Sequence, residues 1–292
     1  MEAVELFLDA FDLRRGTFAA RLKICRKQFS EVAVHDLRVA ARRLLAFVEI
    51  ARLLDPGPRP LKVRRQLKSL IDGFDDLRDA QAMLAGLDDH VRDEASLAPL
   101  RECLLERERT LLGGARRAAR DFEAGELKRR LARLRRRLAE RLADAELDVD
   151  PFTAVDEAFA AVLQCDSVAT IDQPATIHRV RLAFKKFRYR LEVVHQAVPS
   201  LPADHLTRLH DFQTTVGRIQ DVETFLALLS DFAEQCPDRD FAPARACYLR
   251  LQAKDLDTWL AERGALTTFW RPAPARPFPW LRRPPRRKAV AP

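Results

Sequence analysis

Apolar residues recur at helical spacing along most of the chain. Between residues 31 and 54, Leu37, Leu44 and Phe47 gather on one side when successive positions turn by about 100°. No run of alternating apolar and polar residues bounded by tight turns predicts a strand. An all-α fold follows, with helices predicted over 3–29 (interrupted near Gly16), 31–54, 61–90, 93–121, 123–146, 151–166, 175–198, 204–235 and 241–262.

The polar positions of one predicted helix occur a second time in the chain. The stretch 34–50 reads VHDLRVAARRLLAFVEI, and 177–193 reads IHRVRLAFKKFRYRLEV. Further on, FDDLRDAQAML (74–84) matches VGRIQDVETFL (216–226). Repeats of this length predict an internal duplication, with copies of about 1–147 and 148–263. The aligned pairs are His35 with His178, Arg38 with Arg181, Arg42 with Lys185, Arg43 with Lys186, Asp75 with Gly217 and Asp79 with Asp221.

Each of the two repeated helices places a histidine and two cations opposite its apolar side. For a single helix, a solvated amphipathic face explains such a row equally well, but the repetition favours a shared role. Because the row lies away from the apolar side, we expect it to be solvated and its replacement by alanine to leave stability nearly unchanged. A further cationic row on the predicted helix 61–90 extends the candidate site. The three rows consist of His35, Arg38 and Arg42, of His178, Arg181, Lys185 and Tyr189, and of Lys62, Arg65 and Lys68.

The doubled pattern H-x-x-R-x-x-x-[RK]-[RK], followed each time by a helix with an aspartate, resembles the conserved-histidine α-helical domain (CHAD) family. The resemblance covers about residues 1–262. One departure is that Asp75 or Gly73 stands in the first half where the family has a small residue, which is Gly217 in the second half. The resemblance implies two pseudo-symmetric helical bundles packed around a basic cavity, and binding of inorganic polyphosphate.

Composition agrees with an anionic partner. The chain has 51 Lys and Arg against 43 Asp and Glu, a net charge of +8. Its cations are mainly arginine, whose planar fork suits phosphate. Charge alone does not distinguish polyphosphate, nucleic acid and a membrane surface. The basic run within 123–146 is typical of a solvated face, with a polyanion surface as the alternative.

Other classes of function lack their motifs. The sequence has no glycine-rich phosphate loop, no HExxH and no Cys/His cluster, so we predict no cofactor, no metal and no catalysis. Five scattered cysteines predict reduced thiols in a cytoplasmic protein, and no apolar run is long enough for a membrane span. The proline- and arginine-rich stretch 264–292 follows the predicted domain 1–263, and its composition predicts a disordered tail.

The sequence therefore predicts a non-enzymatic receptor for inorganic polyphosphate, with polyphosphate granules as a further candidate partner and location. An RNA- or DNA-binding helical protein is the alternative. Nucleic acid binding would favour stacking aromatics beside the cations, and only Phe184 and Tyr189 are near them. The candidate binding residues are His35, Arg38, Arg42, Arg43, Lys62, Arg65, Lys68, His178, Arg181, Lys185, Lys186, Arg188 and Tyr189.

Overall fold

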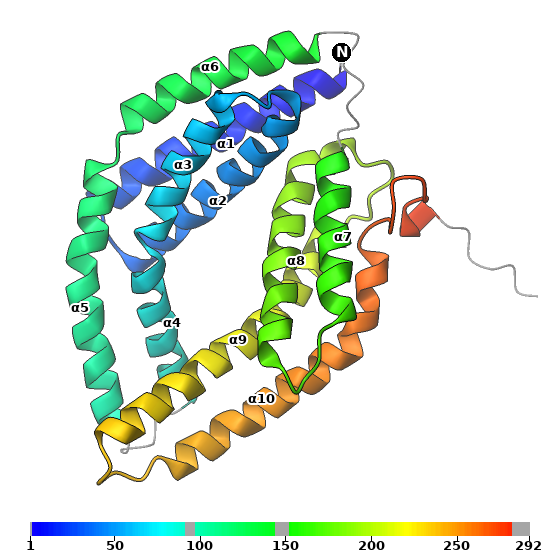
Figure 1. Cartoon of the computed structure of the whole chain (residues 1–292). Coiled ribbons are helices and arrows are strands. Elements are labelled where there is room, and N and C mark those ends of the chain that lie inside the picture. The colour runs from blue at the N-terminus through cyan, green and yellow to red at the C-terminus, as the bar shows by residue number, and fades with distance from the viewer. Residues whose placement is uncertain (1, 91–96, 144–151, 282–292) are drawn as a thin grey trace, which may run out of the picture. The chain divides into compact units, whose positions relative to one another are not determined.

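A computed structural model describes residues 2–90, 97–143 and 152–281 (Figure 1). Every regular element in these ranges is helical, so the predicted fold class is confirmed. The elements are α1 (Glu2–Lys27), α2 (Glu31–Leu54), α3 (Pro58–Asp72), α4 (Asp75–His90), α5 (Ala98–Asp121), α6 (Ala124–Leu142), α7 (Thr153–Ser167), α8 (Pro174–Val194), η2 (His195–Ala197), α9 (His205–Gln235), α10 (Ala242–Glu262), η3 (Arg263–Thr268) and η4 (Pro279–Leu281).

Two predicted helix boundaries are wrong. Helix α1 continues through Gly16 without interruption, and the predicted helix 61–90 is two helices separated by Gly73 and Phe74. A Cβ atom on Gly73 would lie 3.3 Å from the Cβ of Ala118, so the break needs a small residue where it approaches α5. The predicted helix ends at 93, 146 and 151 lie outside the described residues.

The chain divides into two compact units. Unit 1 comprises Met1–Val149 and Arg218–Asp255, and unit 2 comprises Asp150–Gly217 and Leu256–Pro292. Their first boundary lies close to the predicted repeat boundary at 147/148. However, parts of α9 and α10 belong to unit 1, so the units do not coincide with the two sequence repeats. The duplication itself stays a prediction.

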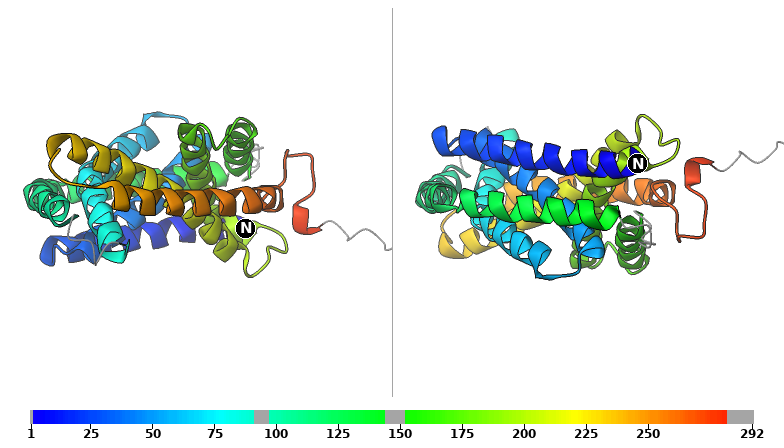
Figure 2. Two further views of the ribbon diagram at one scale, coloured as in Figure 1. Left: turned by 90° about the horizontal axis from the view of Figure 1, so that it is seen from below. Right: turned by 90° about the horizontal axis from the view of Figure 1, so that it is seen from above.

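A first apolar cluster of unit 1 lies where α1, α2, α3 and α6 pack together (Figure 1). The ring centroids of Phe7 and Phe11 lie 4.5 and 5.0 Å from that of Phe47. Leu44, which the sequence pattern places on the same apolar face of α2 as Phe47, is fully buried. Helices α1 and α6 run alongside each other when viewed from above (Figure 2). Helix α3 contacts both α2 and α6, and these contacts hold in place its cationic residues Lys62 and Arg65.

A second apolar cluster of unit 1 joins α4 and α5 to the parts of α9 and α10 that belong to this unit. Phe225 stacks on Tyr248 with their ring centroids 3.8 Å apart, and the Tyr248 hydroxyl donates a hydrogen bond to the carbonyl of Gly86 at 3.0 Å. Buried leucines from α4, α5 and α9 complete the cluster. The cluster explains why residues 218–255 belong to unit 1 although they follow the second repeated helix.

Unit 2 packs α7 against α8 and covers them with the segment that follows α10. Trp270 is fully buried, and its Nε1 donates a hydrogen bond to Oδ1 of Asp156 at 2.7 Å. Arg271 adds two hydrogen bonds to the same carboxylate, at 2.8 and 2.6 Å. The prediction that 264–292 is a disordered tail is therefore wrong for residues 264–281; residues 282–292 lie outside the described range. Composition misled because aromatic anchors in this stretch offset its many prolines.

Candidate functional site

The first repeated helix, α2, begins at a capped end. Ser30 accepts a hydrogen bond at its Oγ from the backbone N–H of Ala33 at 3.2 Å, as N-cap residues do. His35 follows about one turn into the helix and is exposed. Although His35 is exposed, partial burial of its ring lowers its pKa below the ordinary value, and the nearby Arg78 lowers it further. A neighbouring anion would oppose this shift, because it favours the charged imidazole.

Arg38 and Arg42 share one internal counter-ion. The Asp75 carboxylate, at the start of α4, accepts a hydrogen bond from Nη2 of Arg38, and the same Oδ1 lies 3.5 Å from Nη2 of Arg42. Arg38 is only 8% exposed, so the expectation of a solvated row is wrong at this position. Burial lowers the pKa of Arg38, as does Arg42, and Asp75 opposes both effects. An anion that approaches this row must compete with Asp75.

On the second repeated helix, α8, Arg181 has no such counter-ion among the described residues of its own unit. His178 is half-buried, and its Nδ1 has no hydrogen-bond partner among the described residues. Arg181 is also half-buried, and no carboxylate in the described part of unit 2 forms an ion pair with it. Gly217, aligned with Asp75, offers no side chain. The α8 row therefore has a guanidinium that is not neutralised within unit 2.

Two residues expected to bind the ligand, Arg188 and Tyr189, are buried in unit 2. Nη1 of Arg188 lies 3.1 Å from Nδ1 of His210, and its Nε lies 3.5 Å from Oε1 of Glu192. Because a guanidinium only donates, His210 Nδ1 is the acceptor in this contact. The Arg188 guanidinium also lies 5.1 Å from the centre of the Tyr189 ring. These contacts give both residues a packing role within unit 2.

The remaining predicted cations differ in their surroundings. Arg43, Lys68 and Lys186 are exposed, and Lys185 is half-buried on α8. Since α2 belongs to unit 1 and α8 to unit 2, the arrangement of both rows around one basic cavity stays a prediction.

Lys62 and Arg65 lie beside an open pocket of about 460 Å³ in unit 1. Both are exposed on α3, and neither has a hydrogen bond or ion pair with the described residues. Arg64, their neighbour in sequence, instead forms an ion pair with Glu49 of α2, with Nε 2.5 Å from Oε1. The pocket residues are Lys62, Arg65, Gln66 and Ser69 of α3, with Phe122, Glu123 and Arg130 from the end of α5 and the start of α6.

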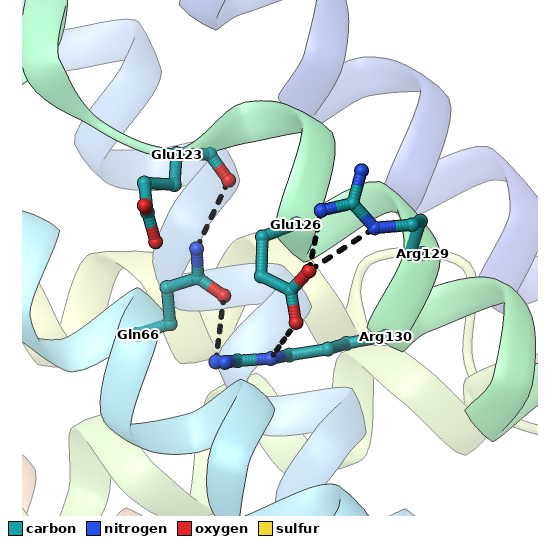
Figure 3. Close-up of polar contacts among 5 residues, drawn as sticks. All are labelled: Gln66, Glu123, Glu126, Arg129 and Arg130. Atoms are coloured by element: carbon teal, nitrogen blue, oxygen red, sulfur yellow. Dashed lines mark hydrogen bonds and ion pairs between the residues drawn. The ribbon is translucent and has the colours of Figure 1, made fainter.

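A hydrogen-bond network joins the pocket residues Gln66, Glu123 and Arg130 to Glu126 and Arg129 (Figure 3). Gln66 donates through Nε2 to the carbonyl of Glu123 at 3.0 Å and accepts from Nη1 of Arg130 at 3.2 Å. Arg130 also donates through Nε to Glu126 at 2.8 Å, and Arg129 donates to the other oxygen of that carboxylate. These hydrogen bonds lower the pKa of Glu126 below its usual range, with the bond from Arg129 contributing most. The network ties α3 to the first turn of α6.

Sequence reasoning missed Gln66 and Arg130. The basic run on α6 is typical of a solvated face, and several of its arginines do form ion pairs within one or two turns, as Arg137 does with Glu140 at 3.1 Å. Only the packing of α6 on α3 distinguishes Arg130 from its neighbours. Helical spacing within one segment carries no signal for that contact.

Within residues 2–90, 97–143 and 152–281, no group of three or more His, Cys, Asp and Glu side chains is placed to hold a metal ion. No helix in the same ranges combines the length and apolarity needed to cross a bilayer.

Comparisons with known proteins agree with the sequence pattern. The family model for the CHAD domain matches residues 10–230. The crystal structure of the CHAD domain from the plant Ricinus communis is similar, with a TM-score of 0.62, 19% identity, and coverage of 91% of this chain and 89% of that one. PptA from Streptomyces chartreusis has a TM-score of 0.57 at 18% identity, over 92% of this chain and 99% of that one. No curated protein matches the chain. The structural similarities, at these identities, concern the fold.

Proposed function

The chain belongs to the CHAD family, and from that premise we propose that it is a non-enzymatic receptor for inorganic polyphosphate. The family is associated with polyphosphate binding. The repeated helices α2 and α8 supply the candidate contacts, with the residues His35, Arg38, Arg42, His178, Arg181 and Lys185.

One observation carries the proposal: Arg181 is accessible on α8 and no carboxylate of its own unit neutralises it. Its neighbours His178 and Lys185 lie about one turn away on either side, a separation of about 5 Å along the helix. A polyphosphate chain carries charge on every unit and has no base edges to be read. Repeated cations at a regular spacing suit such a ligand better than a single specific contact.

Nucleic acid is less well supported as the ligand. Bases bind single-strand receptors by stacking on exposed aromatic rings. The two rings nearest the α8 row, Phe184 and Tyr189, are 0% and 9% exposed, so neither offers a face to a base. The burial of both rings favours a ligand that is recognised through phosphate alone.

The experiment that tests the proposal compares long-chain polyphosphate, single-stranded RNA and DNA at equal phosphate concentration and equal salt. We expect polyphosphate to bind most tightly to the full chain. Equal or tighter binding of RNA would overturn the choice of ligand. In the same preparation, release of orthophosphate in the presence of magnesium should not exceed background, and release that is lost in His178→Ala would show an enzyme instead.

A cytoplasmic location and association with polyphosphate granules belong to the same proposal. We expect the tagged full chain to collect at granules where polyphosphate accumulates, and Arg181→Ala to be spread evenly. Equal recruitment of both proteins would contradict a granule association that depends on this site.

A further inference from the structure

The pocket between α3 and the start of α6 has a positive lining that the repeated helices do not use. Lys62 and Arg65, three residues apart on one face of α3, are exposed and have no charged partner among the described residues. Arg130 of α6 also lines the pocket, and Glu123 is the one carboxylate among the lining residues. Arg130 is paired with Glu126, so Lys62 and Arg65 against the single carboxylate of Glu123 leave an excess positive charge that favours an anion.

The pocket wall is held in place before any ligand arrives. Arg130 uses Nε for Glu126 and Nη1 for Gln66, so its guanidinium is fixed while its Nη2 group is not used in either contact. At the end of α5, Arg26 of α1 donates to the carbonyls of Ala119 and Phe122 at 2.8 and 2.5 Å, which anchors the turn into α6. A pre-organised site loses less conformational entropy when it binds than flexible surface cations do.

Helix α6 begins at this wall. Its first residue, Ala124, follows Glu123 directly, and no side chain caps its first amides. The N-terminal end of a 19-residue helix carries a partial positive charge, which adds to the cations of α3. The helix end alone would not define a site, but here it adjoins a pocket with two unpaired cations.

The size of the pocket indicates more than a single ion. Its volume of about 460 Å³ falls within the range of small-ligand sites. Lys62 and Arg65 border the pocket beside α6, whereas Arg64 pairs with Glu49 of α2. The pocket is therefore distinct from the row on α2 that contains Arg38 and Arg42.

We propose that this α3–α6 pocket is a second binding site of the chain and takes the phosphate groups of a condensed phosphate through Lys62, Arg65 and Arg130. The ligand class rests on the proposed function, whereas the preference for a polyanion rests on the pocket itself. A short condensed phosphate fills the pocket alone, and a long chain reaches it as an additional point of attachment.

The test uses the full chain labelled with ¹⁵N-glycine, titrated with tripolyphosphate. The chain has only nine glycines, and Gly125 lies in the first turn of α6, beside the pocket. Gly125→Ala assigns its signal. We expect this signal to shift in the wild type and in the control Lys128→Ala/Arg133→Ala, which removes two exposed α6 cations outside the pocket. In Lys62→Ala/Arg65→Ala the apparent affinity read from that signal should fall by about tenfold or more. A signal that does not move, or that moves equally in this variant, overturns the proposal.

A second variant, which should bind more tightly and not more weakly, keeps the test valid if the first variant misfolds. Glu123→Gln removes the pocket carboxylate and leaves all three cations, so tripolyphosphate should bind about threefold more tightly, since a like charge no longer repels it. Unchanged or weaker binding overturns the proposal even if Lys62→Ala/Arg65→Ala is unstable.

Long-chain polyphosphate separates this inference from the proposed function. If Arg181→Ala and His178→Ala bind the long chain as tightly as the wild type while tripolyphosphate still shifts Gly125, the site of the proposed function fails and the pocket stands. If the long chain binds while Gly125 remains unmoved by either ligand, the pocket fails and the proposed function stands.

Discussion

On α2, Arg38 and Arg42 share the carboxylate of Asp75, whereas on α8 the residue aligned with Asp75 is Gly217. The two helices carry the same order of histidine, arginine and second cation. Their electrostatics differ because Asp75 pairs with Arg38 on α2, whereas no carboxylate in the described part of unit 2 pairs with the aligned Arg181 on α8. The two copies of the motif therefore have the same arginine in sequence, but Arg38 is occupied by Asp75 and Arg181 is more accessible to a ligand.

The same difference gives the two rows different roles in stability and in ligand binding. A buried arginine that has a carboxylate partner holds α2 to the start of α4, since the pair is lost if the helices separate. An accessible arginine without such a partner has little to stabilise within its own unit. From this contrast we expect the α2 row to matter more for stability and the α8 row to matter more for affinity.

The largest expected effect is on binding. Arg181→Ala should lower the affinity for long-chain polyphosphate by about tenfold or more, because a hydrogen bond to a charged group contributes about 1.5–3 kcal/mol. Arg38→Ala should lower it less, because Asp75 already occupies that guanidinium. Calorimetric titration of both variants, with Lys128→Ala as an exposed control, measures the ranking. A larger loss in Arg38→Ala would contradict the comparison.

Stability should show the reverse ranking. Arg38→Ala removes one partner of a mostly buried pair and the packing of its side-chain stem, so we expect the free energy of unfolding to fall by about 2 kcal/mol. The half-exposed Asp75 keeps the loss below that of a fully buried pair. Arg181→Ala should change it by less than about 0.5 kcal/mol. Urea denaturation of the two variants checks this, and Arg38→Met, which keeps the apolar stem, should recover part of the loss.

The sequence predicted the all-helical fold and placed the two repeated helices closely, because apolar spacing and helix-ending prolines are local signals. It did not predict that Arg38 is buried, since its burial depends on Asp75, which lies 37 residues further along the chain. For the same reason it missed Arg130, which is defined by Gln66 of another helix. The ordered segment after residue 263 was missed because Trp270 finds its partner Asp156 at a distance of 114 residues. In each case the sequence did not reveal a contact between elements that are far apart along the chain.

An exchange of residues between the halves tests the counter-ion directly. Asp75→Gly should raise the affinity for polyphosphate about threefold, because Arg38 and Arg42 lose their internal competitor. Gly217→Asp should lower it by a similar factor, since it brings a carboxylate to the aligned place on α9. A Cβ atom at Gly217 meets nothing within 4 Å, so Gly217→Ala is a suitable steric control. Equal affinities for Asp75→Gly and wild type, with both folded, would show that Asp75 does not compete with the ligand.

The smallest expected effect concerns protons at His35. Its pKa is lowered in the unbound protein, first by burial and then by Arg78, and a bound polyanion favours the charged form and raises it. Affinity should therefore rise by about twofold as the pH falls below about 6.5, and level off once the unbound histidine is also charged. The unbound protein should meanwhile lose a little stability over that range, because the unfolded chain takes up the proton first. Titrations in two buffers of different ionisation enthalpy measure the proton uptake. His35→Gln should reduce that uptake, and an unchanged value would place the proton elsewhere.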